Sequence, residues 1–507
     1  DEIDHQAGDV HDRGDERRRA VRSRHRSSRS ARATRGRCAV TDLANLSLER
    51  VAAGLRSGEF SSLEVTRAAL ARADRAQQRS NCFLVIEHEP ALAAAAAADA
   101  ARAAGRALGP LHGVPLAHKD MFARAGKVVR YGSRVRADHA PAARAVVLER
   151  LAQAGALDIG ALAMAEFALG ATGHNAAFGD CRNAHDPAFI AGGSSSGSGA
   201  AVALGAVYAS IGSDTGGSVR IPAAANGCVG LKPTYGLLPR TGSMPLTPSI
   251  DVLGPIARSV RDLAIVLRIV AGHDADDRQS SRRPPPDYLA ATTRGVRGLR
   301  IGIPRTEFFA ADSRAVGDAL LRARRVFEDA GALCGEIELP PVAPLAELSR
   351  AIVYSEATGL HAPWLREHAE RYTPQVRVRA STGLAIPAPI YFEALQLRAP
   401  LLQQFVTSVF ARCDVLLTPL LPIEVPRRDE TDVGGGARMW ELLAKLVRCT
   451  APFNFLGLPA LAVPVGQDGN GLPIAAQLVG RPFAEDRLLQ AAAVQEAAWP
   501  ARVPVAP

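Results

Sequence analysis

The pattern of apolar and polar positions along this chain predicts helices and strands in alternation. Residues 61–64 read Ser-Ser-Leu-Glu, which fits a capping box for a helix that continues through ALARADRA, and Ser47 fits the cap of an earlier helix. An Ala-rich helix follows at 91–107. Beyond it, short apolar runs typical of strands alternate with segments of helical period. We expect strands at 111–120, 156–160, 207–213, 228–233, 299–304, 414–419 and 460–466, and helices at 141–154, 259–271, 313–330, 391–412 and 485–497.

This alternation predicts an α/β protein whose sheet is covered by helices. The segment 276–286, DDRQSSRRPPP, either divides two lobes or forms a surface loop. Residues 1–39 are rich in Arg and Ser and lack an apolar period, so we expect a disordered N-terminal extension ahead of a folded domain over 40–507. An organellar transit peptide is a second interpretation of this extension, and its acidic residues count against it.

Charge and composition narrow the class of protein. The net charge is +9, but residues 1–38 contribute +4 of it, so the rest of the chain is nearly neutral for its size and nucleic acid is not an expected partner. No apolar run is long enough to predict a membrane span. The seven cysteines are scattered and form no C-x-x-C pair, which favours reduced thiols in a cytoplasmic protein without a metal site. We expect no cofactor.

The Gly/Ser-rich segment 190–224 is the richest in candidate chemistry, and several interpretations compete for it. A phosphate-binding loop is disfavoured because GSGAAV lacks the third glycine and no strand directly precedes it. GSSSG, centred on Ser195, matches the G-x-S-x-G elbow of α/β-hydrolases, but a loop stands where the elbow needs a strand. A flexible linker is the third interpretation, although a helix-like and a strand-like segment follow the cluster directly.

Five separated motifs decide among these interpretations. GVPLAHKD, GGSSSGSGAAVA, GSDTGGSVRIPAA, GLKPTYG and APFNFLGLPALAVPVG occur in this order, and together they resemble the amidase signature family. The resemblance extends from about Thr41 to Val494. It implies a central mixed β-sheet covered by helices on both faces. It further implies a signature core at about 110–260 and a substrate-pocket region at about 272–450.

The resemblance implies a Ser-Ser-Lys triad. By motif, the nucleophile is Ser218, the bridging serine is Ser194, which follows a cis peptide bond, and the base is Lys119. A lysine with its ordinary pKa near 10.4 is protonated at pH 7, so burial must lower the pKa to about 7–8 before Lys119 can accept a proton. Arg220 is a candidate cation for lowering it further; its alternative role is to pair with Asp214.

Other positions follow from the same motifs. The backbone N–H groups of Thr215, Gly216, Gly217 and Ser218 are the expected oxyanion hole, because glycines let successive donors converge on one point. Ser195, Asp214 and Arg220 are expected to support the site by hydrogen bonds. Three further residues are expected to contact substrate, namely Gly192, Gly193 and Arg379.

The predicted reaction is hydrolysis of a small-molecule amide to an acid and ammonia or an amine through an acyl-serine. Two kinds of family member fit: a stand-alone amidase, and the glutaminase subunit of an aspartyl/glutamyl-tRNA amidotransferase complex. A nucleic-acid partner is expected only for the second. Arg379 matches the arginine with which such subunits grip glutamine, but Val447 stands where their aspartate is expected. We therefore favour the stand-alone amidase. The oligomeric state stays open, with a homodimer as one candidate.

Overall fold

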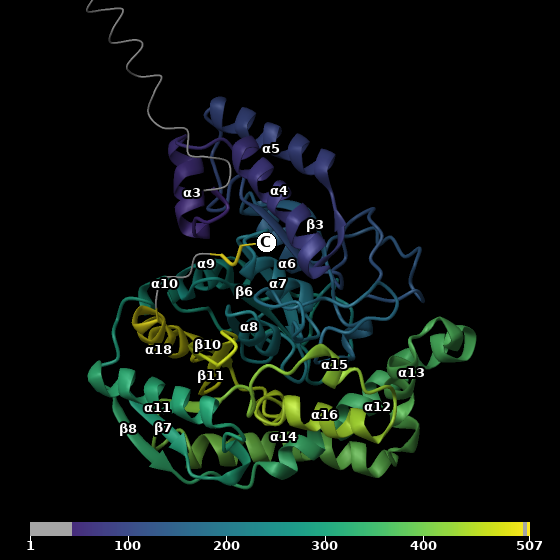
Figure 1. Ribbon diagram of the computed structural model, residues 1–507, viewed down its shortest axis with the longest axis vertical. Helices are drawn as coiled ribbons and strands as arrows, with labels where there is room; N and C mark the ends of the chain where they lie inside the picture. The colour runs from purple at the N-terminus through teal and green to yellow at the C-terminus, as the bar shows by residue number, and fades with distance from the viewer. Residues whose placement is uncertain (1–42, 500–503, 507) are drawn as a thin grey trace, which may run out of the picture.

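The computed structural model describes residues 43–499 and 504–506. Its larger sheet is mixed and has eight strands, which extend from β4 to β8 at the lower left of Figure 1. The predicted extension at 1–39 lies outside the described residues. The strand order is β4-β6-β5-β10-β11-β9-β7-β8. β7 pairs in parallel with β8 and β9, whereas the other neighbours pair antiparallel. The strands are β4 Ala209–Asp214, β5 Val229–Lys232, β6 Val252–Ala257, β7 Arg300–Pro304, β8 Leu333–Ile337, β9 Val415–Pro419, β10 Ala460–Gln467 and β11 Pro473–Gly480.

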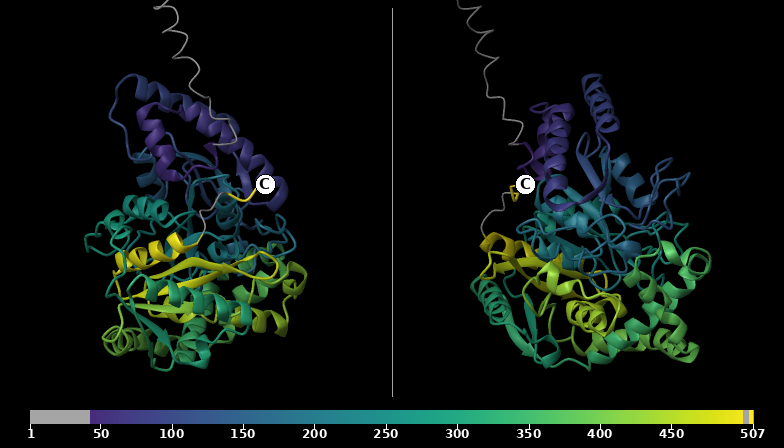
Figure 2. Two further views of the ribbon diagram at one scale, coloured as in Figure 1. Left: turned by 60° about the vertical axis from the view of Figure 1, so that its left-hand side comes forward. Right: turned by 45° about the vertical axis from the view of Figure 1, so that its right-hand side comes forward.

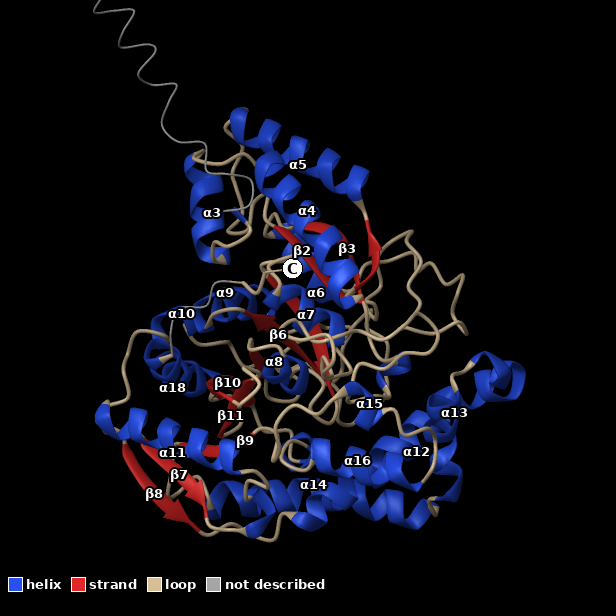
Figure 3. Cartoon of the chain, in the orientation of Figure 1, coloured by secondary structure: helices blue, strands red, loops and turns tan. Residues whose placement is uncertain are grey.

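A second, smaller sheet carries the predicted lysine. It has the order β1-β3-β2, with β1 Phe83–Ile86, β2 Pro115–Lys119 and β3 Leu157–Leu162. Figure 3 shows β2 and β3 in the upper part of the molecule, apart from β7 and β8. The strand predicted at 111–120 is shorter than expected because Gly113, with φ +76°, turns the chain before it.

Helices cover both faces of the large sheet. Side chains alternate along a strand, and β10 shows the consequence: Leu461 and Val463 belong to one apolar core and Ala462 to another. The first core is closed by α9 Val260–Val270, α11 Arg314–Asp329 and α18 Glu485–Ala498, the second by α7 Ser196–Ala203 and α8 Arg220–Ala225. The left view of Figure 2 shows the yellow α18 alongside β10 and β11. The predicted fold class is thereby confirmed.

The amino-terminal helices begin where the capping signals place them. α3 Leu48–Ser57 is capped by the Ser47 side chain. α4 Ser62–Ser80 has the complete predicted capping box between Ser61 and Glu64. The Ala-rich helix is α5 His88–Ala103, and α6 Val146–Gln153 is shorter than predicted.

The region 272–450 contributes a layer of helices beside the sheet. Its longest members, α12 Ala343–His368 and α14 Ala388–Ser408, lie next to each other in the lower part of Figure 1. The segment 276–286 contains no helix or strand and is mostly exposed, as expected of a surface loop. The remaining helices of this region and its flank are α10 Tyr288–Ala291, α13 Pro374–Ser381, α15 Arg428–Thr431, α16 Ala437–Val447 and α17 Ala451–Phe455, with short 3-10 turns at Glu166–Ala168, Glu307–Phe309, Ala369–Arg371 and Thr382–Ala385.

The described residues contain neither a membrane-spanning helix nor a cluster of metal ligands. Within residues 43–499 and 504–506, no helix is both long and apolar enough to cross a membrane. In the same part of the chain, no three His, Cys, Asp or Glu side chains are grouped so that they could hold a metal ion.

Candidate active site

Lys119 is the last residue of β2, and its side chain reaches into the Gly/Ser cluster. It is 1% exposed. Its Nζ donates to Ser194 Oγ at 2.7 Å and to Ser213 Oγ, at the end of β4, at 2.8 Å. β2 is held beside β4 because the N–H of Ile211 donates to Nδ1 of His118 at 3.0 Å. The structure thus brings together two of the three predicted triad residues and adds Ser213, which the sequence did not single out.

Burial sets the electrostatics of this lysine. It lowers the pKa of Lys119 from 10.5 to about 7, against the negative charges of Asp251 and Asp214, which raise the pKa. Arg220, the second cause offered from the sequence, instead donates from Nε and Nη2 to the Asp214 carboxylate at 2.9 Å each. Arg220 and Asp214 thus form a buried ion pair, the second of the two roles considered for Arg220.

The serines lie on two adjoining segments. The peptide bond Gly193–Ser194 is cis, as the resemblance implies. Ser195 N–H donates to the Ser218 carbonyl at 3.3 Å, and Ser195 Oγ donates to the Ser213 carbonyl at 3.3 Å, so the two segments are held side by side. Ser218 itself is half-buried. No hydrogen bond joins the Ser194 and Ser218 side chains in this structure.

Asp214 organises the loop that carries Ser218. Its carboxylate accepts the backbone N–H groups of Gly217 at 2.8 Å, Val219 at 3.2 Å and Arg220 at 3.3 Å. Burial by itself raises the pKa of Asp214, but the charge of Arg220 and the hydrogen bonds to the carboxylate hold the pKa well below its usual range. Asn454 of α17 donates to the same carboxylate at 2.8 Å. Asp214 is therefore a buried, ionised anchor for this loop.

These contacts correct the predicted set of oxyanion donors. The N–H of Gly217 is already bonded to Asp214, so it does not point at a substrate oxygen. Among the residues that the structure describes, no acceptor is bonded to the N–H groups of Thr215, Gly216 or Ser218. Thr215 is held by its side chain, since Oγ1 donates to Asp251 Oδ1 at 2.6 Å. Three of the four predicted donors thus stay available.

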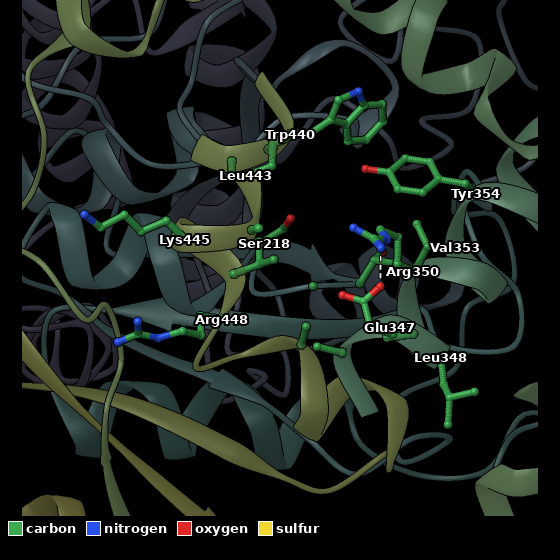
Figure 4. Close-up of a pocket in the computed structure, with 18 of the residues that line it drawn as sticks. Ser218, Glu347, Leu348, Arg350, Val353, Tyr354, Trp440, Leu443, Lys445 and Arg448 are labelled. Carbon is green, nitrogen blue, oxygen red and sulfur yellow. Dashed lines mark hydrogen bonds and ion pairs between the residues drawn. The ribbon is translucent and has the colours of Figure 1, made fainter. Parts of the chain in front are cut away.

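Ser218 opens onto a large cavity of about 1070 Å³. Figure 4 shows the Ser218 hydroxyl pointing into the space that Trp440 and Tyr354 border. The rings of these two residues are 5.3 Å apart and meet edge to face at 88°. Most of the other lining side chains are aliphatic; they include Leu169, Ile221, Leu246, Leu348, Val353, Leu397, Leu443 and Val447. The wall is therefore suited to an apolar group.

The charged groups of this wall differ in how well they are paired. Asp312 pairs with Arg448 at 2.8 Å, and Glu347 pairs with Arg350. The predicted substrate residue Arg379 lines the cavity, is 8% exposed and donates from Nη1 to the Leu169 carbonyl at 2.5 Å. Its Nε is buried and, within the described part of the chain, has no partner. Arg379 is thus a largely buried cation that pairs with no carboxylate among residues 43–499 and 504–506.

Two of the predicted substrate residues have a different place. Gly192 and Gly193 are buried and do not belong to the wall of this cavity. A Cβ on Gly192 would lie 2.9 Å from Pro222 Cα, and one on Gly193 would lie 2.6 Å from the Gly170 carbonyl oxygen. Close backbone packing accounts for these glycines, and neither of them lines the cavity onto which Ser218 opens.

Several site residues come from segments that sequence reasoning did not connect to the nucleophile. Thr450 directly precedes α17 and Asn454 lies within it, both in the TAPFN stretch, and Gln477 lies on β11. Arg220 donates to Gln477 Oε1 at 2.5 Å and to Asn454 Oδ1 at 2.6 Å. The signal for Ser213 and Asn454 was present, since both lie within quoted motifs. For Gln477 no motif marks the position.

Comparison with known proteins places this geometry among its relatives. A family model described as Amidase matches residues 64–489. A glutamyl-tRNA(Gln) amidotransferase subunit from Moorella thermoacetica is 40% identical over 460 residues, covering 86% of this chain and 93% of the relative. A chain of a vestigial protein complex linked to the evolutionary origins of an s-triazine catabolic enzyme superposes with a TM-score of 0.84 at 34% identity, covering 90% of this chain and 100% of that chain. The peptide amidase of Stenotrophomonas maltophilia has a TM-score of 0.78 at 30% identity, covering 90% and 98%.

Proposed function

The chain belongs to the amidase signature family, and on that premise we propose that it hydrolyses an amide through Ser218, Ser194 and Lys119. One observation carries the proposal. A fully buried lysine, whose pKa lies at about 7, contacts the Ser194 hydroxyl at 2.7 Å beneath the cavity onto which Ser218 opens. A base with a pKa near the working pH is the most effective one, because it is partly free and can also return the proton.

In the proposed reaction, Ser218 Oγ attacks the carbonyl carbon of the amide, and its proton passes through the Ser194 hydroxyl to Lys119. The resulting oxyanion accepts hydrogen bonds from the free N–H groups of Thr215, Gly216 and Ser218. The C–N bond then breaks, and the proton returns through Ser194 to the leaving nitrogen, which departs as ammonia or an amine. Water hydrolyses the acyl-serine by the same route and restores Ser218.

The hydrogen-bond pattern supports this route without completing it. Nζ of Lys119 and Oγ of Ser194 are 2.7 Å apart, so a free amine can accept the hydroxyl proton of Ser194 while the Ser194 oxygen accepts the proton of Ser218. Catalytic hydrogen bonds are often long in a substrate-free enzyme and tighten when the substrate is bound.

The cavity favours an amide with an apolar or aromatic acyl group. Burial of an apolar group the size of a leucine or phenylalanine side chain against Trp440 and Tyr354 contributes roughly 1.5–3 kcal/mol to the free energy of binding. Arg379 adds a buried donor for a carbonyl or carboxylate oxygen. An α-ammonium group has no matching anion in the described wall, because Asp312 and Glu347 are paired with arginines and Val447 is aliphatic. Glutamine is therefore expected to be a poor substrate.

A second candidate function is the glutaminase role within a tRNA-dependent amidotransferase complex. The relative from Moorella thermoacetica is named as part of such an amidotransferase, and it is 40% identical over most of both chains. In this function Arg379 would hold the carboxylate of glutamine. The aliphatic Val447 at the position of the expected aspartate is the observation against it.

A panel of amides separates the two functions. Ammonia release is measured with an arylacetamide, an aliphatic amide, a carboxylated amide without an amino group, and glutamine. We expect turnover of the first three and little of glutamine. Arg379→Met should weaken only the carboxylated amide, and Val447→Asp should improve glutamine relative to the arylacetamide. Glutamine as the best substrate of the unaltered protein would overturn the stand-alone assignment.

A further inference from the structure

The peptide that joins Gly216 to Gly217 is held at both of its ends. Its carbonyl oxygen accepts a hydrogen bond from Thr450 Oγ1 at 2.6 Å. Its N–H donates to Asp214 Oδ1 at 2.8 Å. Because the peptide unit is planar, these two bonds together fix the orientation of the whole plane. The plane lies between the N–H groups of Gly216 and Ser218, two of the donors proposed for the oxyanion.

The two glycines make this restraint necessary. Glycine lacks a Cβ, so its backbone samples conformations that other residues avoid and loses more freedom on folding. Gly217 has φ +129°, in the region that favours glycine. Without a fixed plane between them, the N–H groups of Gly216 and Ser218 would each be free to turn. An oxyanion hole works because its donors are oriented before the charge develops.

Thr450 is itself well placed to act as the restraint. It is fully buried, and its N–H donates to the Val447 carbonyl at 3.0 Å, which fixes the backbone between α16 and α17. Its Oγ1 lies 3.1 Å from the same carbonyl, but a hydroxyl has one proton, and the contact to Gly216 is shorter. A Cβ on Gly217 would lie 2.7 Å from Thr450 Oγ1, so the hydroxyl sits directly against this glycine.

The segment 450–454, which contains Thr450, also supports the N–H end of the Gly216–Gly217 peptide. Asn454, four residues after Thr450, donates from Nδ2 to Asp214 Oδ1 at 2.8 Å and to the Asp214 carbonyl at 3.1 Å. Asp214 Oδ1 is the atom that accepts the Gly217 N–H. The segment 450–454 therefore reaches both partners of the plane, although it lies more than 200 residues from the nucleophile loop in the sequence.

We propose that Thr450 is a positioning residue for amide hydrolysis: its hydroxyl orients the Gly216–Gly217 peptide and thereby aims the neighbouring N–H groups at the oxyanion. This inference rests on the proposed function, in which Ser218 is the nucleophile. It predicts that the hydroxyl of Thr450 contributes to the transition state and little to substrate binding, since Thr450 is not part of the cavity wall.

The test compares Thr450→Val, which removes the hydroxyl and keeps the shape, with Thr450→Ser, which keeps the hydroxyl. For Thr450→Val we expect kcat to fall about 10- to 100-fold, because misplacement of donors by about 1 Å has that cost. KM should stay within about threefold, and Thr450→Ser should regain kcat to within about threefold of the unaltered protein. Affinity for a boronic acid, which forms a tetrahedral adduct with a nucleophilic serine, should fall in parallel with kcat.

Thr358→Val is the matched control. Thr358 is a buried threonine of α12 whose hydroxyl accepts the Gly383 N–H at 2.8 Å, away from the cavity wall. We expect its loss to reduce thermal stability and leave kcat unchanged. Three results would overturn the proposal: folded Thr450→Val keeps kcat within twofold of the unaltered protein, Thr450→Val raises KM without lowering kcat, or Thr450→Ser is impaired as much as Thr450→Val. Ser218→Ala is run alongside: if it stays active, the proposed function fails, whatever Thr450→Val does.

Discussion

Replacing Lys119 by methionine removes the amine that contacts Ser194 and Ser213 but keeps most of the apolar side chain. The expected loss follows from protonation. With a pKa of about 7, roughly half of the lysine is free base at pH 7, whereas an ordinary lysine with a pKa of 10.5 would be free in about one molecule in three thousand. A positioned general base contributes about 10²–10⁴ in rate. We therefore expect kcat/KM at pH 7.5 to fall by that factor in Lys119→Met.

The assay is ammonia release from the best amide of the panel, followed from pH 5 to pH 10. The unaltered protein should lose kcat/KM about tenfold per pH unit below pH 7, where Lys119 becomes protonated, and level off above it. Lys119→Met should lack this acidic limb and recover some rate at high pH as hydroxide replaces the base. An unchanged rate at pH 7.5, or an acidic limb that persists in the variant, would show that another group is the base.

The low pKa of Lys119 favours catalysis but lowers the stability of the folded protein at pH 7. The pKa of Lys119 is lower in the folded state, at about 7, than in the unfolded state, at 10.5, so the unfolded chain binds more protons between these values. The free energy of unfolding therefore rises with pH through this window, and at pH 7 the buried amine costs on the order of 4 kcal/mol. In urea titrations, Lys119→Met should be more stable than the unaltered protein at pH 7, and the difference should shrink at pH 10.

Three other substitutions test the loop around Ser218. Ser218→Ala should leave less than about 10% of the activity and the melting temperature nearly unchanged, because Ser218 is half-buried and its hydroxyl makes no hydrogen bond in the described structure; a higher rate would exclude Ser218 as the nucleophile. Gly217→Ala should lower the free energy of unfolding by about 1–3 kcal/mol and remove most of the rate, since its φ is +129° and the new Cβ would meet Ile221 at 2.7 Å; unaltered stability in urea would contradict this. Arg220→Met should cost about 3–5 kcal/mol by leaving Asp214 buried and unpaired, whereas a loss below about 1 kcal/mol in the same titration would mean that the pair is not needed.

Local sequence signals predicted the helices and strands that are encoded by neighbouring residues. They missed strands whose formation depends on contacts with distant parts of the chain. The capping box at Ser61 and the apolar runs of β5, β9 and β10 are local, and the structure confirms them. β6 was missed because it contains Gly254 and Pro255, which usually interrupt a strand. The structure gives the reason for the glycine: a Cβ there would lie 2.0 Å from the Leu231 carbonyl oxygen on the neighbouring strand. That close approach is a property of the assembled sheet.

For the site, the sequence predicted which residues gather but not how each is used. The family resemblance implied that Lys119 and Ser194 act together, and the structure places Nζ of Lys119 2.7 Å from Ser194 Oγ. The four consecutive oxyanion donors could not be distinguished in the same way. Whether the N–H of Gly217 is free depends on Asp214, three residues earlier, turning its carboxylate back onto the loop, and that orientation is set by Arg220 and by Asn454 from the far end of the chain.

A comparison of two buried lysines shows why geometry, rather than a shifted pKa, identifies the base. Burial, together with the charge of Arg220, lowers the pKa of Lys232 to about 7, the same value as for Lys119. Yet Nζ of Lys232 donates to the Pro233 carbonyl at 3.1 Å, and a carbonyl has no proton to give up. Nζ of Lys119 instead meets two hydroxyl groups, one of which belongs to the segment held against Ser218. A free amine at Lys232 faces a carbonyl and no hydroxyl partner in the described part of the chain, whereas a free amine at Lys119 lies 2.7 Å from a serine hydroxyl that carries a proton.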